Sequence, residues 1–350
     1  MRILVTADIH LSASHPERQE ALADVVRIAE EEDVEYLLIA GDMFDAVTDV
    51  DDVKTEIRDL FTDNDFRSFV IPGNHDEGAF REEDYFGDDL EVLSHTPFEQ
   101  VDLGDVNLLA IPFTQARFGQ LVDDIHDARV DEQLNVLLLH GTLSTATGDV
   151  FGHESRYLPF TPEQLLETGA DYVFAGHIHS APTRHTFGRH DCVFAYPGSP
   201  VSITTKETNK RGVWILDTAQ QELRNVHVNS AYYRRETLDL IPGEAPEKLT
   251  ALHDRLAGQD LANARLLVEP VGFIEMDEAR FFEELESIVQ DVDPADYRID
   301  RTGIESAGAI LDSELYRGFE EKLEAIEEVD RRAVRGMVLK ALSRERRGSS

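Results

Sequence analysis

The stretch Leu38-Ile39-Ala40-Gly41-Asp42-Met43 joins an apolar run to a glycine and then to a carboxylate. The run Tyr36–Ala40 is β-rich and nearly continuously apolar, which favours a strand buried on both faces. Gly41 permits a tight turn where this strand ends. The stretch therefore predicts a strand that delivers Asp42 to the edge of a buried sheet.

Similar apolar runs recur along the chain, and amphipathic helix candidates lie among them, notably Pro16–Glu32 and Val50–Asp63. The other strand candidates are Arg2–Ala7, Ser68–Ile71, Asn107–Ile111, Asn135–Leu139, Tyr172–Ala175, Cys192–Tyr196, Gly212–Leu216 and Glu222–Val228. Strands that alternate with helices, followed by a strand-dense stretch, predict an α/β fold in which two packed sheets are flanked by helices.

The pattern changes near residue 230, and a length of 350 residues also favours more than one domain. We expect a catalytic domain at 1–230, a small α/β capping domain at 231–300 and a C-terminal helical region at 301–350 that could dock a partner. The predicted elements are strands Glu236–Leu240 and Ala264–Pro270, helices Pro246–Leu256 and Asp277–Val289, a linker at Arg298–Gly308 and helix over 311–345.

The chain is strongly acidic, with 33 Lys and Arg against 70 Asp and Glu and a formal net charge of −37. Such a surface repels itself in dilute buffer, and concentrated salt screens that repulsion. We therefore expect a halophilic archaeal protein adapted to a salt-rich cytoplasm, with an ordinary acidic protein as the alternative. The charge does not exclude a nucleic-acid substrate.

Composition also bears on location. No apolar run reaches the roughly 18 residues that a membrane span needs, and the N-terminus enters a strand-like run without a signal-peptide pattern. The single cysteine, Cys192, excludes an intramolecular disulfide framework. We expect a cytoplasmic protein with no membrane partner.

Metal-binding side chains follow the predicted strands in short motifs. They are Asp8, His10, Asp42, Asn74, His140, His177 and His179. Strand ends that converge on one sheet edge would bring these distant residues together, and the two oxygens of Asp42 suit it to be a shared ligand. Oxygen and nitrogen donors without thiolates suit Mn, Fe or Zn better than Ca. Each motif alone is weak, since His-x-His is common and Gly73-Asn74-His75-Asp76 could be a turn. Their order, each after an apolar run, predicts a two-metal site.

A two-metal site is suited to phosphoester hydrolysis. Two cations about 3.5–4 Å apart polarise a phosphoryl oxygen, activate a water and stabilise the developing charge. His75 directly follows a predicted ligand, so it could protonate the leaving oxygen from the site rim. Asp76 could fix the orientation and tautomer of that imidazole. We therefore predict His75 and Asp76 as catalytic residues.

The motif set over residues 1 to about 215 resembles the calcineurin-like metallophosphoesterase superfamily. Within it the chain is similar to the SbcD-type branch of DNA double-strand-break repair exonucleases. The resemblance rests on Ala7-Asp8-Ile9-His10-Leu11, Leu38-Ile39-Ala40-Gly41-Asp42-Met43-Phe44-Asp45, Ile71-Pro72-Gly73-Asn74-His75-Asp76 and Tyr196-Pro197-Gly198-Ser199-Pro200. It implies a four-layer α-β-β-α sandwich with a small cap and C-terminal helices.

The resemblance also implies how the site works. One metal would bind Asp8, His10, Asp42 and His179, and the other Asp42, Asn74, His140 and His177, with manganese preferred. It further implies exonuclease and endonuclease cleavage of DNA, and a coiled-coil, SMC-like ATPase partner; a homodimer is also open. Two features depart from the branch: Asp45 stands where these nucleases commonly carry a histidine, and the C-terminal region is short.

Positive charge is scarce, so its placement is informative. Residues that flank the last metal-binding motif could contact phosphates or be ordinary surface charge; they are Arg184, Arg189, Lys206, Lys210 and Arg211. A second basic group lies on the predicted C-terminal helix and favours partner docking over a DNA contact; it comprises Arg331, Arg332, Arg335, Lys340, Arg344, Arg346 and Arg347. Among the remaining histidines, only His153 and His185 lie close to the motifs.

These observations leave the substrate open. The leading hypothesis is a metal-dependent nuclease that acts on DNA. A phosphodiesterase or phosphatase for small molecules would use the same metal site but a closed pocket over it. A scaffold that recruits an ATPase without catalysis is a third hypothesis, and the complete set of metal-binding residues argues against it.

Overall fold

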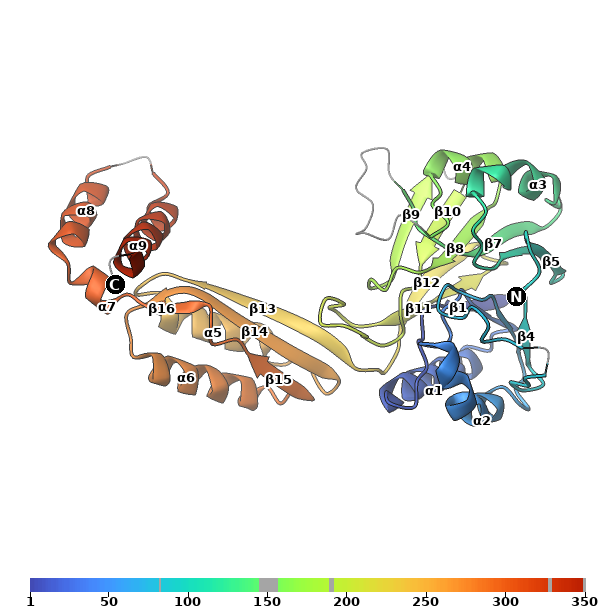
Figure 1. Cartoon of the computed structure of the whole chain (residues 1–350), viewed down its shortest axis with the longest axis horizontal. Helices are drawn as coiled ribbons and strands as arrows, with labels where there is room; N and C mark the ends of the chain where they lie inside the picture. The colour runs from blue at the N-terminus through green and yellow to red at the C-terminus, as the bar shows by residue number, and fades with distance from the viewer. Residues whose placement is uncertain (82, 145–156, 189–191, 327–328, 349–350) are drawn as a thin grey trace. The chain divides into compact units, whose positions relative to one another are not determined.

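The computed structural model describes all residues except 82, 145–156, 189–191, 327–328 and 349–350 (Figure 1). His153 and Arg189 thus lie outside the described residues. The chain divides into two compact units, Met1–Tyr232 and Tyr233–Ser350, which are taken in turn. None of the helices in the described parts of the chain has the length and apolar character needed to cross a bilayer.

The first sheet of the first unit is mostly parallel. Its strands run in the order β12 (Glu222–His227), β11 (Gly212–Asp217), β1 (Arg2–Thr6), β2 (Tyr36–Ile39), β3 (Arg67–Val70) and β4 (Leu90–Val92). β1 to β4 pair in parallel, whereas β11 pairs antiparallel with β1 and with β12. Parallel pairing places the carboxyl ends of β1, β2 and β3 at one edge.

The second sheet has the order β5 (Glu99–Asp102), β6 (Val106–Ile111), β7 (Leu134–His140), β8 (Tyr172–Gly176), β10 (Cys192–Tyr196) and β9 (Thr183–Phe187). Its central strands are parallel and its edge strands, β5 and β9, are antiparallel. The sequence missed β4, β5 and β9 because they are partly exposed edge strands without an apolar run.

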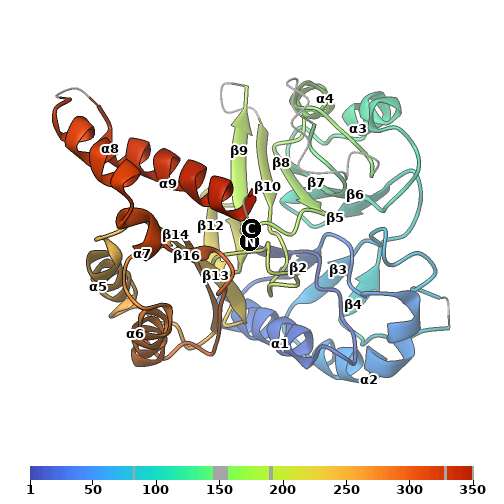
Figure 2. The same ribbon diagram turned by 60° about the vertical axis from the view of Figure 1, so that its left-hand side comes forward.

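Apolar side chains separate the layers. Val5 and Phe69 of the first sheet share one buried cluster with Leu108 and Phe174 of the second. Helices α1 (Pro16–Glu31) and α2 (Val50–Leu60) pack on the outer face of the first sheet. Helices α3 (Val122–Asp127) and α4 (Pro162–Thr168) pack on the outer face of the second, opposite α1 and α2 (Figure 2). The predicted four-layer α-β-β-α sandwich is confirmed. Two short 3-10 helices, η1 (Val47–Asp49) and η2 (Phe118–Gln120), complete the unit.

The second unit is a small α/β unit followed by helices. Its sheet contains β13 (Tyr232–Leu240), β14 (Ala264–Ile274), β15 (Asp296–Ile299) and β16 (Ile304–Ser306), the last two pairing with β14. Helices α5 (Ala245–Leu256) and α6 (Glu278–Asp291) lie along this sheet (Figure 1). They are followed by α7 (Gly308–Leu311), α8 (Glu314–Glu324) and α9 (Arg331–Gly348).

The predicted linker at Arg298–Gly308 is wrong. This segment ends β15, forms β16 and begins α7, and both strands pair in parallel with β14. β15 is polar and mostly exposed, so its sequence lacks the apolar pattern of a strand. Pairing with β14, together with burial of Ile304 and Ala307, orders the segment. The predicted helix over 311–345 is confirmed in α8 and α9, which a break separates.

Cys192 offers a probe of the first unit. It begins β10 with 1% of its surface exposed, and burial raises the pKa of its thiol to about 12. Because the thiolate is the reactive form, we expect no reaction with Ellman's reagent in the native protein and one thiol titrated after unfolding in guanidinium. A fast reaction of the native protein would show that β10 opens to solvent.

Candidate metal centre

The loops after the parallel strands hold an unusual backbone. Asp8, His10, Asp42 and His177 have positive φ angles of 54°, 52°, 50° and 91°. Non-glycine residues rarely adopt this region, and each such residue costs on the order of 1–3 kcal/mol. Main-chain hydrogen bonds hold two of these loops together, from Asp8 N to Gly41 O and from His10 N to Asp42 O, each 3.0 Å. The strain is therefore concentrated where the predicted ligands lie.

The first group of donor atoms comes from Asp8, His10, Asp42 and His179, whose ligand atoms lie within 4.8 Å of one another. His10 Nε2 faces His179 Nε2 at 3.0 Å and Asp42 Oδ2 at 3.7 Å. Asp8 is fully buried and accepts hydrogen bonds from His177 N at 2.8 and 3.1 Å. Burial raises the pKa of Asp8, so a cation would stabilise its ionised form.

The second group comes from Asp42, His140 and His177, and Asn74 joins it. Asn74 Oδ1 lies 3.0 Å from both His140 Nε2 and His177 Nδ1. His140 Nδ1 lies 2.9 Å from Ala40 O. Because a carbonyl oxygen only accepts, His140 Nδ1 carries the proton and a neutral His140 presents its Nε2 lone pair to the group. The structure thus brings all seven predicted donors together.

Asp42 belongs to both groups. Its Oδ2 lies 3.3 Å from His140 Nε2 and 3.7 Å from His10 Nε2, and its Oδ1 accepts from His75 N at 2.8 Å. Burial opposes ionisation of Asp42, but His140 and His10 lower its pKa below the usual value. Asp42 in turn helps to raise the pKa of His140 to about 9 against its burial. Without a cation, protons on the histidines balance the negative charge of the carboxylates. A divalent cation can replace these protons when it binds.

Gly73 leaves room for this arrangement, because a Cβ there would lie 2.2 Å from Asp42 Oδ1 and 2.3 Å from Asp42 N. We expect Gly73→Ala to displace the Asp42 carboxylate and to lower metal affinity by about 10–100-fold, the usual cost of disturbing a ligand's support. Titration of the metal-stripped protein with Mn²⁺ measures this. Gly318→Ala is the control, since Gly318 lies in α8 with nothing within 4 Å of its Cβ position and without a positive φ angle; equal losses in both variants would contradict the prediction.

His75 lies at the rim and is exposed, as predicted. Its Nδ1 lies 2.8 Å from the main-chain oxygen of Asp45. The prediction that Asp76 orients this ring is wrong. Asp76 is buried and accepts from the backbone N–H groups of Gly73, Phe44 and Met43 at 2.8, 2.9 and 3.1 Å, so it joins the loops that carry Asp42 and Asn74. Burial raises its pKa to about 6.

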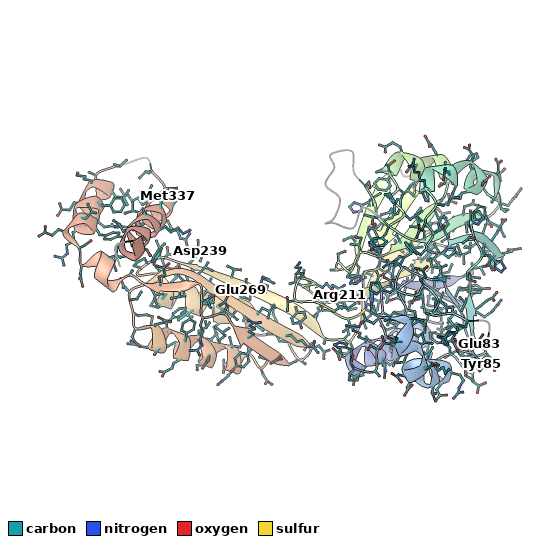
Figure 3. All side chains as sticks on the ribbon, viewed as in Figure 1. Glu83, Tyr85, Arg211, Asp239, Glu269 and Met337 are labelled. Atoms are coloured by element: carbon teal, nitrogen blue, oxygen red, sulfur yellow. The ribbon has the colours of Figure 1, made fainter. Side chains whose placement is uncertain are left out.

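The prediction for Arg211 is also wrong. Arg211 is neither a phosphate contact nor a surface charge, because its side chain is fully buried beside β11 (Figure 3). Its Nε donates to Ser199 O at 2.8 Å, and its Nη2 donates to His179 O and Ser180 O at 2.6 and 2.8 Å. Burial lowers its pKa to about 10. Arg211 thus ties the backbone of His179 to the turn that contains Ser199.

Sequence reasoning missed Glu207 and the role of Asp45. Glu207 Oε1 lies 3.4 Å from His179 Nδ1, and Glu207 Oε2 accepts from Ile203 N at 2.7 Å. Asp45 Oδ1 lies 3.3 Å from His10 Nδ1. Glu207 belongs to none of the quoted motifs, so no signal in the sequence pointed to its contact. Asp45 ends the motif that carries Asp42, and the sequence marked it only as a departure from the SbcD-type branch. His185, in contrast, is exposed on β9 and lies in neither group.

A family model described as calcineurin-like phosphoesterase matches residues 1–181. The fold and the two donor groups define a metal-dependent phosphoesterase. The chain belongs to the calcineurin-like phosphoesterase family, whose members use two divalent metals.

The chain is also similar to individual proteins from several organisms. An uncharacterized metallophosphoesterase of Bacillus subtilis (strain 168), YhaO, is 26% identical over 246 residues, covering 62% of this chain. The match spans 57% of the length of that relative. TT1561 of Thermus thermophilus has 13% identity and a TM-score of 0.43, covering 65% of this chain and 99% of its own. Purple acid phosphatase PPD1 of yellow lupin has 12% identity and a TM-score of 0.45, covering 64% of this chain and 52% of its own.

Proposed function

We propose that the protein is a dinuclear, metal-dependent phosphodiesterase that cleaves DNA as an exonuclease or endonuclease of the SbcD type. The observation that carries the hydrolytic part is the pair of donor groups that share Asp42, with exposed His75 beside them. Asp8, His10, Asp42 and His179 would hold one metal, and Asp42, Asn74, His140 and His177 the other. Two bound divalent cations, Mn²⁺ in this proposal, supply charge stabilisation and an activated water.

The chain's own residues supply proton transfer and positioning. His75 Nδ1 donates to the Asp45 carbonyl, because that oxygen can only accept. In the imidazolium form, His75 can give its Nε2 proton to the leaving oxygen, which leaves a neutral ring with its remaining proton on Nδ1. Glu207 and Arg211 fix the side chain and the backbone of His179. The residues present therefore fit the two metals that the family uses.

One observation favours DNA as the substrate, and it concerns Lys206. Lys206 is exposed and directly precedes Glu207, which contacts His179, so a positive charge lies next to the segment that supports the centre. A phosphate backbone needs such sequence-independent contacts. A pocket of about 280 Å³ does lie beside the centre, lined by Gly73, Asp76, Phe80 and Phe113 among others. None of the seven donors lines it, and its lining has no Lys, Arg or His, so it is not a phosphate pocket over the metals.

The test uses purified full-length protein at high KCl with Mn²⁺. Labelled duplex DNA, labelled single-stranded DNA and bis-p-nitrophenyl phosphate are offered separately. We expect hydrolysis of the small ester and of at least one DNA. Hydrolysis of the small ester with both DNAs untouched would reject the nuclease and favour the small-molecule phosphodiesterase or phosphatase.

The acidic composition leads us to propose adaptation to high salt. A net charge of −37 with six lysines among 350 residues makes the folded state repel itself when salt is low. We expect Tm to rise by about 3 °C between roughly 0.2 M and 2 M KCl, which corresponds to about 2 kcal/mol for a protein of this size. Differential scanning calorimetry measures this, and a Tm that is flat or falls with KCl would reject the adaptation.

We propose that α8 and α9 dock the coiled-coil ATPase. Leu315 and Met337 are 66% and 67% exposed, and Met337 projects from α9 (Figure 3). The arginines of α9 were predicted to face a partner or DNA, but Arg332 pairs with Asp239 and Glu244, and Arg335 pairs with Glu320. The apolar side chains, not these arginines, form the proposed contact. The side chains of Arg344, Arg346 and Arg347 lie outside the described residues.

A pull-down with a purified coiled-coil, SMC-like ATPase tests the docking surface. The variants Leu315→Asp and Met337→Asp should abolish co-purification while leaving hydrolysis of the small ester intact. Retention of the ATPase by both variants would reject the surface. Gel filtration of the protein alone reports whether it is a homodimer.

A further inference from the structure

The pocket beside the second donor group takes no part in the proposed metal chemistry. Its volume of about 280 Å³ is close to the lower end of the roughly 300–1,000 Å³ that is typical of small-molecule sites. Three segments line it: 72–80 after β3, 94–96 between β4 and β5, and 112–115 after β6. The pocket therefore suits a small ligand such as a single ring system.

Two residues of the pocket wall connect it to the second donor group. Gly73 lines the pocket, and a Cβ on Gly73 would lie 2.2 Å from Oδ1 of Asp42, the shared ligand. Phe113 forms another part of the wall, and its ring centroid lies 5.9 Å from that of Tyr157. The ring of Tyr157 lies 4.8 Å from that of His177. A ligand in the pocket therefore contacts residues that lie next to the proposed metal ligands.

Two half-buried phenylalanines give the pocket apolar walls, and packing holds both in place. The ring of Phe80 lies 5.5 Å from that of Phe44 and 5.6 Å from that of Phe86, measured between centroids. Phe113 N donates to Pro72 O at 2.8 Å, which joins the loop after β6 to the loop after β3. Aromatic walls held in this way favour a flat aromatic ligand, because ring contacts add stability beyond the burial of apolar area.

The polar groups of the lining select among flat ligands. Among the described residues of the lining there is no Lys, Arg or His, so the pocket offers no cation to a phosphate. Glu77 and Gln115 are exposed and bring a carboxylate and an amide to the pocket. An ionised carboxylate only accepts hydrogen bonds, whereas an amide donates and accepts. Glu77 therefore favours a ring with an amino group, which cytosine, adenine and guanine carry and thymine lacks.

We propose that this pocket binds the base of a nucleotide next to the scissile phosphodiester and prefers a base with an exocyclic amino group. The base stacks against Phe80 and Phe113, and Glu77 accepts from its amino group. A base in the pocket cannot also stack on its neighbours or pair with a complementary strand, so the preferred substrate is single-stranded or frayed DNA. The inference rests on the proposed function, and it adds the strand state and the base preference of the substrate.

Abasic DNA tests the pocket directly. A short single strand of deoxycytidines is compared with a strand of abasic tetrahydrofuran residues, which keeps every phosphodiester and lacks every base. With Mn²⁺ at high KCl, we expect kcat/KM of the native protein to be about 5–150-fold lower on the abasic strand, the equivalent of the roughly 1–3 kcal/mol that one stacked base contributes. Phe113→Ala should lose most of this discrimination, because it removes one of the two stacking walls.

Glu77→Ala tests the base preference without changing a buried side chain, because Glu77 is exposed. We expect the native protein to favour a strand of deoxycytidines over a strand of thymidines by about 2–10-fold in kcat/KM, the equivalent of the roughly 0.5–1.5 kcal/mol of one hydrogen bond. In Glu77→Ala this ratio should fall close to one. An unchanged ratio would overturn the preference for an amino group.

The control is Tyr85→Ala, which removes an aromatic side chain that is 51% exposed and lies outside the lining of the pocket (Figure 3). It should leave both ratios unchanged. Equal kcat/KM of the native protein on the deoxycytidine and abasic strands would overturn the inference, as would undiminished discrimination in Phe113→Ala. A native protein that hydrolyses bis-p-nitrophenyl phosphate but cleaves none of the strands would instead reject the proposed nuclease itself.

Discussion

His75→Ala is expected to lower kcat by about 10²–10⁴-fold, the usual contribution of a positioned general acid, while both metals stay bound. The reason is geometric: the His75 ring is exposed, whereas the contact that reaches Asp42 comes from its backbone N–H at 2.8 Å. Alanine keeps that N–H. Metal content by plasma mass spectrometry and kcat on DNA and on bis-p-nitrophenyl phosphate provide the measurement.

Comparing the losses of kcat on the two substrates tests whether His75 acts as the general acid or in another role. p-Nitrophenolate leaves readily without a proton, whereas a deoxyribose alkoxide does not, so the loss should be larger on DNA. His95→Ala is the control, because His95 is also exposed and contacts only Glu99 in the described contacts. Equal losses on both substrates would show that His75 positions the phosphate instead, and loss of bound metal would make it a ligand.

Asp42→Asn is expected to abolish binding of both metals and to bring activity to the background rate. Asparagine has nearly the same shape and can still accept from His75 N, but it removes the one negative charge that lies 3.3 Å from His140 Nε2 and 3.7 Å from His10 Nε2. The loss of affinity should exceed the roughly 100-fold that removal of an outer partner costs.

Thermal shift on adding Mn²⁺ provides the readout, because a ligand that binds the folded state raises its stability in proportion to RT ln(1 + [L]/Kd). The native protein should show a shift and Asp42→Asn none, while the metal-stripped forms should both unfold cooperatively. Asp8→Asn is the matched comparison, since Asp8 belongs to one donor group alone, and it should keep one metal. Retention of one metal by Asp42→Asn would show that Asp42 is not shared.

Much of the fold followed from local patterns. The central strands are buried nearly throughout; they are β1, β2, β3, β6, β7 and β8. Because both faces of these strands are buried, their sequences are apolar along the whole run. Edge strands such as β9 and β15 lack an apolar run because one side of each strand is exposed to solvent. Helix α4 could have been found, since Thr161 and Gln164 form a capping box that the sequence displays.

The types of the seven donors and their placement after strands followed from the amino-acid sequence, because strand ends in parallel sheets converge whatever the loops do. The residues that support these donors became evident from the three-dimensional arrangement. Glu207 and Arg211 lie outside the metal-binding motifs, and each contacts His179 or its backbone from another part of the chain. Asp45 ends the motif that carries Asp42, but its contact is with His10 of another loop. Such contacts depend on three-dimensional approach and leave no periodic pattern in the sequence, which is why Arg211 was interpreted as surface charge and Asp76 as a partner of His75.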